Sequence, residues 1–77
     1  IELSKDVSLI EMLVPASWIG KTLIDLDLRG QYSVNVVAIK SGAVTDVTPD
    51  PDKPMEKGQI IIISGRNEDL QKLSSIG

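Results

Sequence analysis

Residues 20–39, GKTLIDLDLRGQYSVNVVAI, determine the fold, because their pattern indicates a short amphipathic helix that leads through a polar turn into a buried strand. Thr22 is suited to cap the helix, and Asp25 follows three residues later in a variant of the capping box. The apolar helical face contains Ile19, Leu23 and Leu26, with Ile24 and Leu28 beside it. Gly30 is suited to end the helix. The segment 34–39 is apolar on both faces, which is typical of an interior strand.

The remainder of the chain adds three strands and one helix to this unit. The other predicted strands are residues 8–14, 43–47 and 59–64, and the last helix begins at Asn67 as its N-cap after a turn at Gly65 and Arg66. The loop 48–54 contains three prolines and should not pair regularly. Glu11 is expected at an edge or solvent-facing position of the first strand. The predicted fold class is α+β, a small sheet of about four strands with two helices in the order β-α-β-β-β-α.

The small size of the chain limits the core that it can form. With 77 residues it has room for one domain, and such a domain buries a smaller share of its surface than a large one. The absence of cysteine and histidine excludes disulfides and the usual zinc sites. A second subunit is therefore the expected source of extra stability, and we predict a homodimer.

Charge and hydropathy exclude several classes of partner. The net charge is −3, the eight Lys and Arg residues are scattered, and Trp18 and Tyr32 are the only aromatic residues, which argues against a nucleic-acid polymer. The longest apolar run, residues 60–63, is too short to cross a bilayer. Because the sequence starts at Ile1 and its last helix runs to the end, we interpret residues 1–77 as one domain of a longer protein.

Catalysis is not indicated by any motif in the chain. There is no histidine or cysteine to act as base or nucleophile, and no nucleotide-binding glycine loop. We therefore predict no enzymatic activity, no catalytic residue and no cofactor. The acidic side chains of Asp46, Asp50 and Asp52 could bind a hard cation, but a solvated loop is the favoured interpretation, so no metal site is predicted.

Arg29 and Asn35 form the polar pair that most resembles a binding site. Arg29 lies at the end of the predicted helix and Asn35 near the start of the next strand, on a face shared with Val37 and Ile39, so the turn can bring the two together. Guanidinium binds phosphate well, and an amide offers both donor and acceptor groups. The alternative is structural: Asp25, four residues before Arg29, could pair with it, and Asn35 could satisfy the backbone of the turn.

The sequence around this pair resembles the TrkA-C domain, the C-terminal lobe of regulator-of-potassium-conductance proteins. The motifs that carry the resemblance are Pro15-x-x-x-x-Gly20-Lys21-Thr22-Leu23, Asp27-Leu28-Arg29, Tyr32 and Val36-Val37-Ala38-Ile39-Lys40. Gly58 and Asn67-x-Asp69-Leu70 continue the pattern, so the resemblance covers nearly the whole chain. It differs from many members in having Ser33 instead of Gly after the tyrosine, and Gln59 instead of Asp after Gly58.

The resemblance implies a cytoplasmic regulatory module of a bacterial potassium channel, transporter or cation–proton antiporter, which pairs as a dimer. In the Ktr and related systems such a dimer binds cyclic di-AMP at its interface. By resemblance, Arg29 would contact phosphate and Asn35 the nucleoside, Leu23 and Ile24 would line the pocket, and Pro51 would form its rim. The partners implied are a second copy and a membrane subunit or membrane domain, at the inner face of the cell membrane.

An alternative from another class remains open at this point. The chain could be a structural dimerisation and coupling lobe without its own ligand, in a potassium channel, an antiporter or another transporter.

Overall fold

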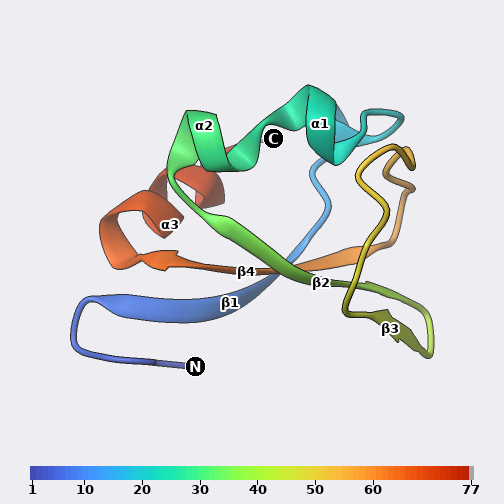
Figure 1. Ribbon diagram of the computed structural model, residues 1–77. Coiled ribbons are helices and arrows are strands. Elements are labelled where there is room, and N and C mark those ends of the chain that lie inside the picture. The colour runs from blue at the N-terminus through green and yellow to red at the C-terminus, as the bar shows by residue number, and fades with distance from the viewer. Residues whose placement is uncertain (77) are drawn as a thin grey trace.

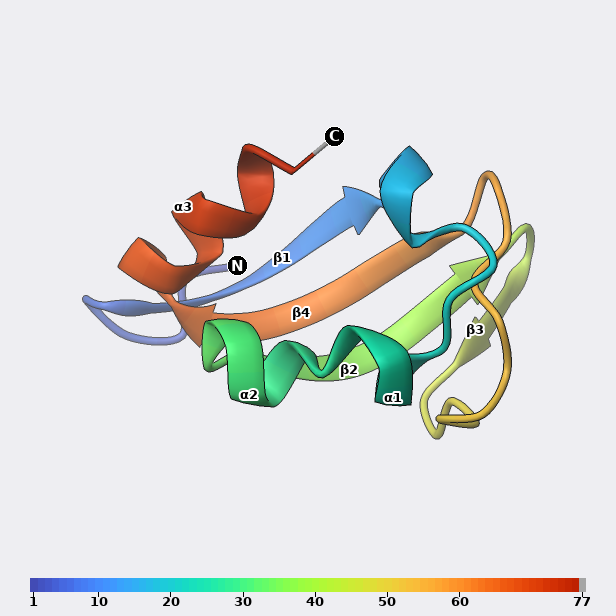
Figure 2. The ribbon, with the colours of Figure 1, turned by 90° about the horizontal axis from the view of Figure 1, so that it is seen from above.

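The computed structural model describes residues 1–76, which form one antiparallel sheet with helices on one of its faces (Figures 1 and 2). The four strands lie in the order β1-β4-β2-β3, and their bounds are β1 Val7–Leu13, β2 Asn35–Ser41, β3 Val44–Asp46 and β4 Ile60–Arg66. The helical segments are η1 Ala16–Trp18, α1 Leu23–Leu26, α2 Leu28–Tyr32 and α3 Asn67–Ser74. The predicted fold class is confirmed. No helix in residues 1–76 is long and apolar enough to cross a membrane.

The core lies between the sheet and the helices. Ile61 and Ile63 of β4 and Leu73 of α3 are fully buried there. The other buried apolar residues in this cluster are Val14, Trp18, Leu28, Val34, Ile39, Met55 and Leu70. Since β4 is a central strand with apolar residues at every position from 60 to 63, its alternate side chains can fill this core, as the run of four isoleucines predicts.

Within residues 1–76, the opposite face of the sheet carries no helix. Glu11 of β1 is exposed on this face, as the sequence predicts for it, and its carboxylate lies 3.4 Å from the Nζ atom of Lys40 on β2. Ile62 lies between these two strands, opposite Glu11 on one side and Ala38 on the other. Both charged side chains are partly exposed, so their ion pair contributes little to stability.

The predicted first helix is divided into two short helices, α1 and α2, by a left-handed residue. Asp27 has φ 44° and ψ 53°, which ends α1 and begins α2 in a new direction. Its carboxylate accepts a hydrogen bond from the backbone N–H of Gly30 at 3.2 Å, and so caps α2. Thr22 and Asp25 form the predicted capping box of α1. Two capping residues five positions apart thus make two helices instead of one.

The prediction that Gly30 ends the helix is wrong. Gly30 lies inside α2, which continues through Gln31 to Tyr32, and the predicted polar turn is reduced to Ser33 and Val34. A Cβ atom at position 30 would overlap the carboxylate of Asp27, so the glycine is required by the cap that precedes it. Ser33 ends the helix instead, in the left-handed conformation with φ 59° and ψ 36°.

Replacing Ser33 by glycine should stabilise the domain. An L-residue in the left-handed region is strained, whereas glycine adopts it readily, so we expect the free energy of unfolding to rise by roughly 0.5–1 kcal/mol. Urea denaturation measures this change. Ser33→Ala is the matched control, because it removes the hydroxyl but keeps the strain, and it should give no gain. Equal stability of Ser33→Gly and wild type would contradict a strained Ser33.

The bounds of all four strands differ from prediction by one or two residues. β4 continues to Arg66 instead of turning at Gly65, and α3 follows at once with Asn67 as its first residue and not as its N-cap. The side chain of Asn67 instead accepts a hydrogen bond from the hydroxyl of Ser8 at 2.6 Å, which ties α3 to β1. β3 has three residues only, shorter than the predicted segment 43–47, and Val44 is exposed.

A β-bulge at Val37 changes which side chains share a face. Val36 pairs with Ile63 and Ala38 with Ile62, so Val37 has no partner in β4. Asn35 pairs with Ser64 and Ile39 pairs with Ile61, and these two partners lie three positions apart on β4, where successive side chains alternate between the faces. The prediction that Asn35 and Ile39 share one face is therefore wrong, because the extra residue reverses the alternation.

Candidate functional site

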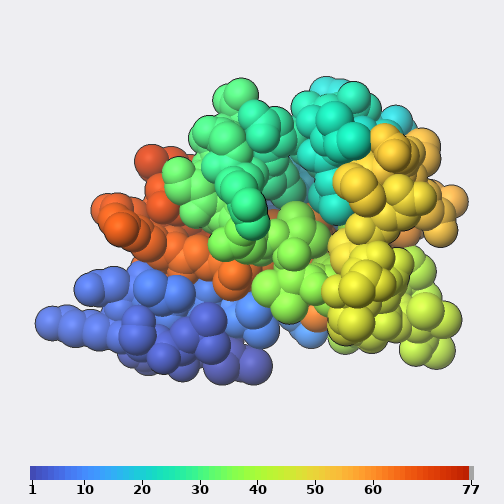
Figure 3. Space-filling view, viewed as in Figure 1, coloured from blue at the N-terminus to red at the C-terminus, as the bar shows by residue number. Residues whose placement is uncertain are grey.

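A groove lies beside the first half of β2, between the α1–α2 segment and the loop that contains Pro51. Its volume is about 570 Å³. Figure 3 shows this side of the molecule, with α1 and α2 above β2 and residues 47–54 in yellow. The lining residues are Leu23, Ile24, Asp27, Leu28, Arg29, Val34, Asn35, Val36 and Pro51. All five residues predicted to form a binding site therefore line one groove.

Arg29 and Asn35 are in direct contact in this groove. The Oδ1 atom of Asn35 accepts two hydrogen bonds from the guanidinium of Arg29, at 3.1 Å from Nε and 2.8 Å from Nη2. The left-handed Ser33 makes this contact possible, because it turns the chain from α2 into β2 within two residues. Asn35 thus holds the guanidinium on the wall of the groove. Within residues 1–76, the Nη1 atom of Arg29 makes no hydrogen bond.

The structural alternative for Arg29, an ion pair with Asp25, does not form. The carboxylate of Asp25 accepts a hydrogen bond from the backbone N–H of Thr22 at 3.0 Å, and the Asp25 N–H donates to the Thr22 hydroxyl at 3.0 Å. The hydrogen bond from the Thr22 N–H, and after it the Thr22 hydroxyl, lower the pKa of the Asp25 carboxyl below its ordinary value of 3.8. Within residues 1–76, Arg29 has no carboxylate within ion-pair distance, so its charge is available to an anion.

Backbone contacts hold the Pro51 loop against α1. The N–H of Ile24 donates to the carbonyl oxygen of Pro51 at 3.3 Å. Farther along, the N–H of Met55 donates to the carbonyl of Lys21 at 2.8 Å, and Gly20 donates to the carbonyl of Met55 at 2.9 Å. Pro51 is therefore fixed beside Ile24, although 27 positions separate them in the sequence.

The arrangement suits an anion attached to a flat apolar group. One side of the groove offers the charged guanidinium of Arg29 and the amide of Asn35, and the other offers Leu23, Ile24 and Pro51. Ile24 is 60% exposed, which is high for a large apolar side chain and leaves it open to a ligand or a partner. Small-molecule sites commonly combine such apolar walls with a few placed polar groups.

Sequence reasoning did not assign Asp27, Leu28, Val34 or Val36 to the groove. Asp27 lies inside the single helix that the sequence predicts, so no capping role follows for it. The sequence signal for the cap is Asp27-x-x-Gly30, in which a good N-cap residue stands three positions before a glycine. Aspartate also tolerates the left-handed conformation that Asp27 adopts. The assignment of Val34 and Val36 to one face follows from the alternation of side chains along an extended segment, once the end of α2 is placed at Tyr32.

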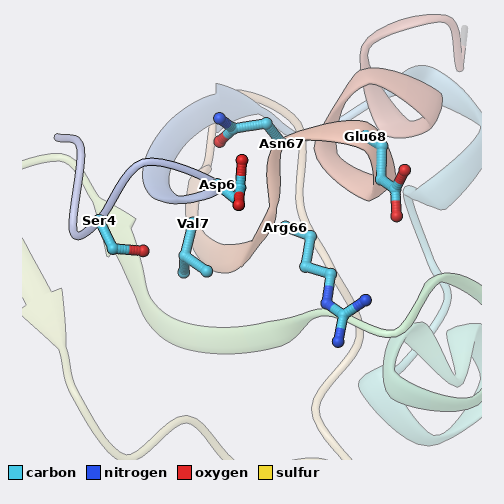
Figure 4. A pocket seen from close by; sticks show the side chains of 6 residues that line it. All are labelled: Ser4, Asp6, Val7, Arg66, Asn67 and Glu68. Carbon is cyan, nitrogen blue, oxygen red and sulfur yellow. The ribbon is translucent and has the colours of Figure 1, made fainter.

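A second hollow, of about 630 Å³, lies at the joint of β1 and α3 (Figure 4). It is lined by Ser4, Asp6, Val7, Arg66, Asn67 and Glu68. Figure 4 shows the guanidinium of Arg66 pointing away from the carboxylates of Asp6 and Glu68. The mixture of charges gives this hollow no clear preference for an anion or a cation, so it is not the candidate site.

The acidic loop uses its carboxylates locally. Asp46 accepts a hydrogen bond from the N–H of Thr48 at 3.0 Å, and Asp50 from the N–H of Asp52 at 2.9 Å. No group of three or more potential metal ligands occurs in the part of the chain that the structure describes. These contacts agree with the interpretation of a solvated loop stabilised by Asx turns.

The chain belongs to the TrkA-C domain family, whose model matches residues 8–76. The resemblance inferred from its motifs is thereby confirmed. Ktr system potassium uptake protein C of Bacillus subtilis (strain 168) is 36% identical over 72 residues, which cover 94% of this chain and 33% of the relative. The K(+)/H(+) antiporter subunit KhtT of the same organism is 37% identical over 59 residues, covering 75% and 36%. The chain therefore spans about a third of the length of these relatives.

The fold is also that of solved structures in the same family. One is the regulator of conductance of K+ (RCK) C domain of the potassium transport protein KtrA in complex with cyclic diadenosine monophosphate. It is 35% identical, with a TM-score of 0.85 over 92% of this chain and 84% of that chain. The family and the fold are those of regulatory domains and not of enzymes, so the prediction of a non-catalytic domain is confirmed.

Proposed function

We propose that residues 1–77 are a cytoplasmic regulatory domain of a longer bacterial protein, and that this domain senses cyclic di-AMP. The ligand would bind between two copies of the chain and bias the gating of a potassium transport system. The membrane part would be a partner subunit or another domain of the parent protein. The parent would be a Ktr-type system or a cation–proton antiporter, because similar chains occur in both kinds of protein.

The observation that carries the proposal is the meeting of five predicted residues in one groove. Arg29, Asn35, Leu23, Ile24 and Pro51 come from three separate segments, yet all of them line it. A similar domain, with which the chain shares 35% of its residues, binds cyclic di-AMP in its solved structure. Each phosphate would take a charge-assisted hydrogen bond from Arg29.

A dimer is proposed because one copy provides half of what the ligand needs. Cyclic di-AMP has two phosphates and two adenines related by two-fold symmetry, whereas each chain places one guanidinium in the groove. Two copies related by a two-fold axis would present the same residues to both halves of the ligand. Ligand bound across the interface would then favour one arrangement of the two copies, which is how it could act on a gate.

Sedimentation velocity with and without cyclic di-AMP tests the dimer. At micromolar concentration we expect a species of twice the 8.3 kDa chain mass, and we expect the ligand to increase its share. A monomer alone under both conditions would contradict the proposal. A dimer that is indifferent to saturating ligand would instead support the dimerisation and coupling lobe.

A further inference from the structure

The two sides of the groove are supported by different parts of the molecule. Arg29 and Asn35 lie on α2 and at the start of β2, which is a central strand of the sheet. The apolar side consists of Leu23, Ile24 and Pro51, which come from α1 and from the Pro51 loop, residues 47–59. No residue of α1 is fully buried, so packing on the core contributes less to the position of this side.

Packing beneath the Pro51 loop is incomplete. A small cavity of about 40 Å³ lies between the loop and the sheet. Ile39 and Ser41 of β2 line it from the sheet, and Pro49, Pro54 and Met55 are among the residues that line it from the loop. Atoms that border a void lack part of their packing contacts, so hydrogen bonds carry more of the attachment of this loop.

The side chain of Gln59 links the end of the loop to the end of β2. Gln59 is 7% exposed, and it is the only buried polar residue in the part of the chain that the structure describes. Its Nε2 atom donates a hydrogen bond to Oγ of Ser41 at 3.0 Å, and its Oε1 atom accepts one from the backbone N–H of Glu56 at 2.7 Å. Loss of such a partner leaves a buried polar group unsatisfied, so the amide fixes the loop where it is.

The loop extends this connection to α1. Met55, four residues before Gln59, is buried and exchanges backbone hydrogen bonds with residues 20–21, just before α1. Pro51 accepts the hydrogen bond from the N–H of Ile24 inside α1. Figure 1 shows the loop in yellow and orange beside α1. A continuous series of contacts therefore runs from β2 through Gln59 and the loop to the apolar side of the groove.

We infer that Gln59 is a positioning residue of the groove. By fixing the Pro51 loop to β2, it sets where the apolar side stands opposite the guanidinium of Arg29. Gln59 lines the small cavity and not the groove, so it acts through the loop and does not touch the ligand. The inference rests on the proposed function for the identity of the ligand, but the hold on the loop is measured without ligand.

Amide hydrogen exchange in the ligand-free protein tests this hold. Gln59→Met keeps a side chain of similar length but removes both hydrogen bonds, and Ser41→Ala removes the acceptor from an exposed position. Both variants should speed the exchange of the amides that join the loop to α1 several-fold, because the loop opens more often. These amides are those of Gly20, Ile24 and Met55.

Two control variants separate this hold from a general loss of stability. Ser41→Thr keeps the hydroxyl and should exchange as the wild type does. Ser8→Ala removes a comparable hydrogen bond, the one that ties α3 to β1, and it should leave the three amides unchanged. Unchanged exchange in Gln59→Met and Ser41→Ala, or equal acceleration in Ser8→Ala, would overturn the inference.

Titration with cyclic di-AMP gives the second readout. Gln59→Met and Ser41→Ala should bind about three- to tenfold more weakly than the wild type, which is the range for one lost hydrogen bond, whereas both control variants should bind normally. Faster exchange with unchanged affinity would overturn the positioning role. A wild type that binds no cyclic di-AMP would contradict the proposed function instead, and the exchange rates alone would then decide whether Gln59 holds the loop and α1 in place.

Discussion

Arg29→Ala should weaken the binding of cyclic di-AMP by at least about tenfold. Hydrogen bonds to charged groups are worth roughly 1.5–3 kcal/mol, and this substitution removes such a group from each half of the proposed site. The protein should remain folded, because the Arg29 side chain is exposed and contacts Asn35 and not the core. Titration calorimetry of the purified chain measures the change in affinity.

Two variants make the Arg29 result specific. Arg29→Lys keeps the charge but cannot form a planar fork, so it should restore only part of the affinity. Arg66→Ala removes an exposed arginine from the separate hollow at the joint of β1 and α3, and it should bind as the wild type does (Figure 4). Equal loss in Arg29→Ala and Arg66→Ala would point to a general effect of net charge, and would argue against a contact in the groove.

Ile61→Ala should lower the free energy of unfolding by roughly 2–5 kcal/mol, the usual cost of an isoleucine-to-alanine change in a core. Ile61 is fully buried between the sheet and the helices and lies opposite Met12 on β1 and Ile39 on β2. A chain of this size has a total stability of about 4–12 kcal/mol, so the variant should lose a large share of it.

Ile62→Ala is the matched control on the same strand. Its side chain lies on the face without helices and is partly exposed, so the same change should cost clearly less. Urea denaturation of both variants at one protein concentration makes the comparison, since dimer formation would shift the midpoints if the concentration varied. A larger loss in Ile62→Ala than in Ile61→Ala would mean that the open face carries the main core.

The helix and strand content follows from local signals in the sequence. The capping box of Thr22 and Asp25 marks the start of α1, and the run of isoleucines marks β4, because these features act through neighbouring residues. The prediction of one helix fails at Asp27, because the spacing of the apolar residues around it does not show that it caps a second helix. The bulge at Val37 was missed for a different reason: it depends on the register with β4, which local pattern does not reveal.

Local sequence signals predict part of the candidate site, and the resemblance to the family predicts the rest. The proximity of Arg29 and Asn35 follows from a short turn between helix and strand. Pro51 is different, because only the backbone contact with Ile24 brings its loop to the groove, and the chain itself gives no local sign of that contact. Its assignment came from resemblance to the family.

Titration calorimetry of the wild-type chain with cyclic di-AMP tests the central claim most directly, because it gives affinity and stoichiometry together. The proposed site predicts saturable heat with one ligand bound per two chains, since one ligand takes Arg29 and Asn35 from both copies. No heat at high micromolar ligand would contradict the claim, and so would one ligand bound per chain.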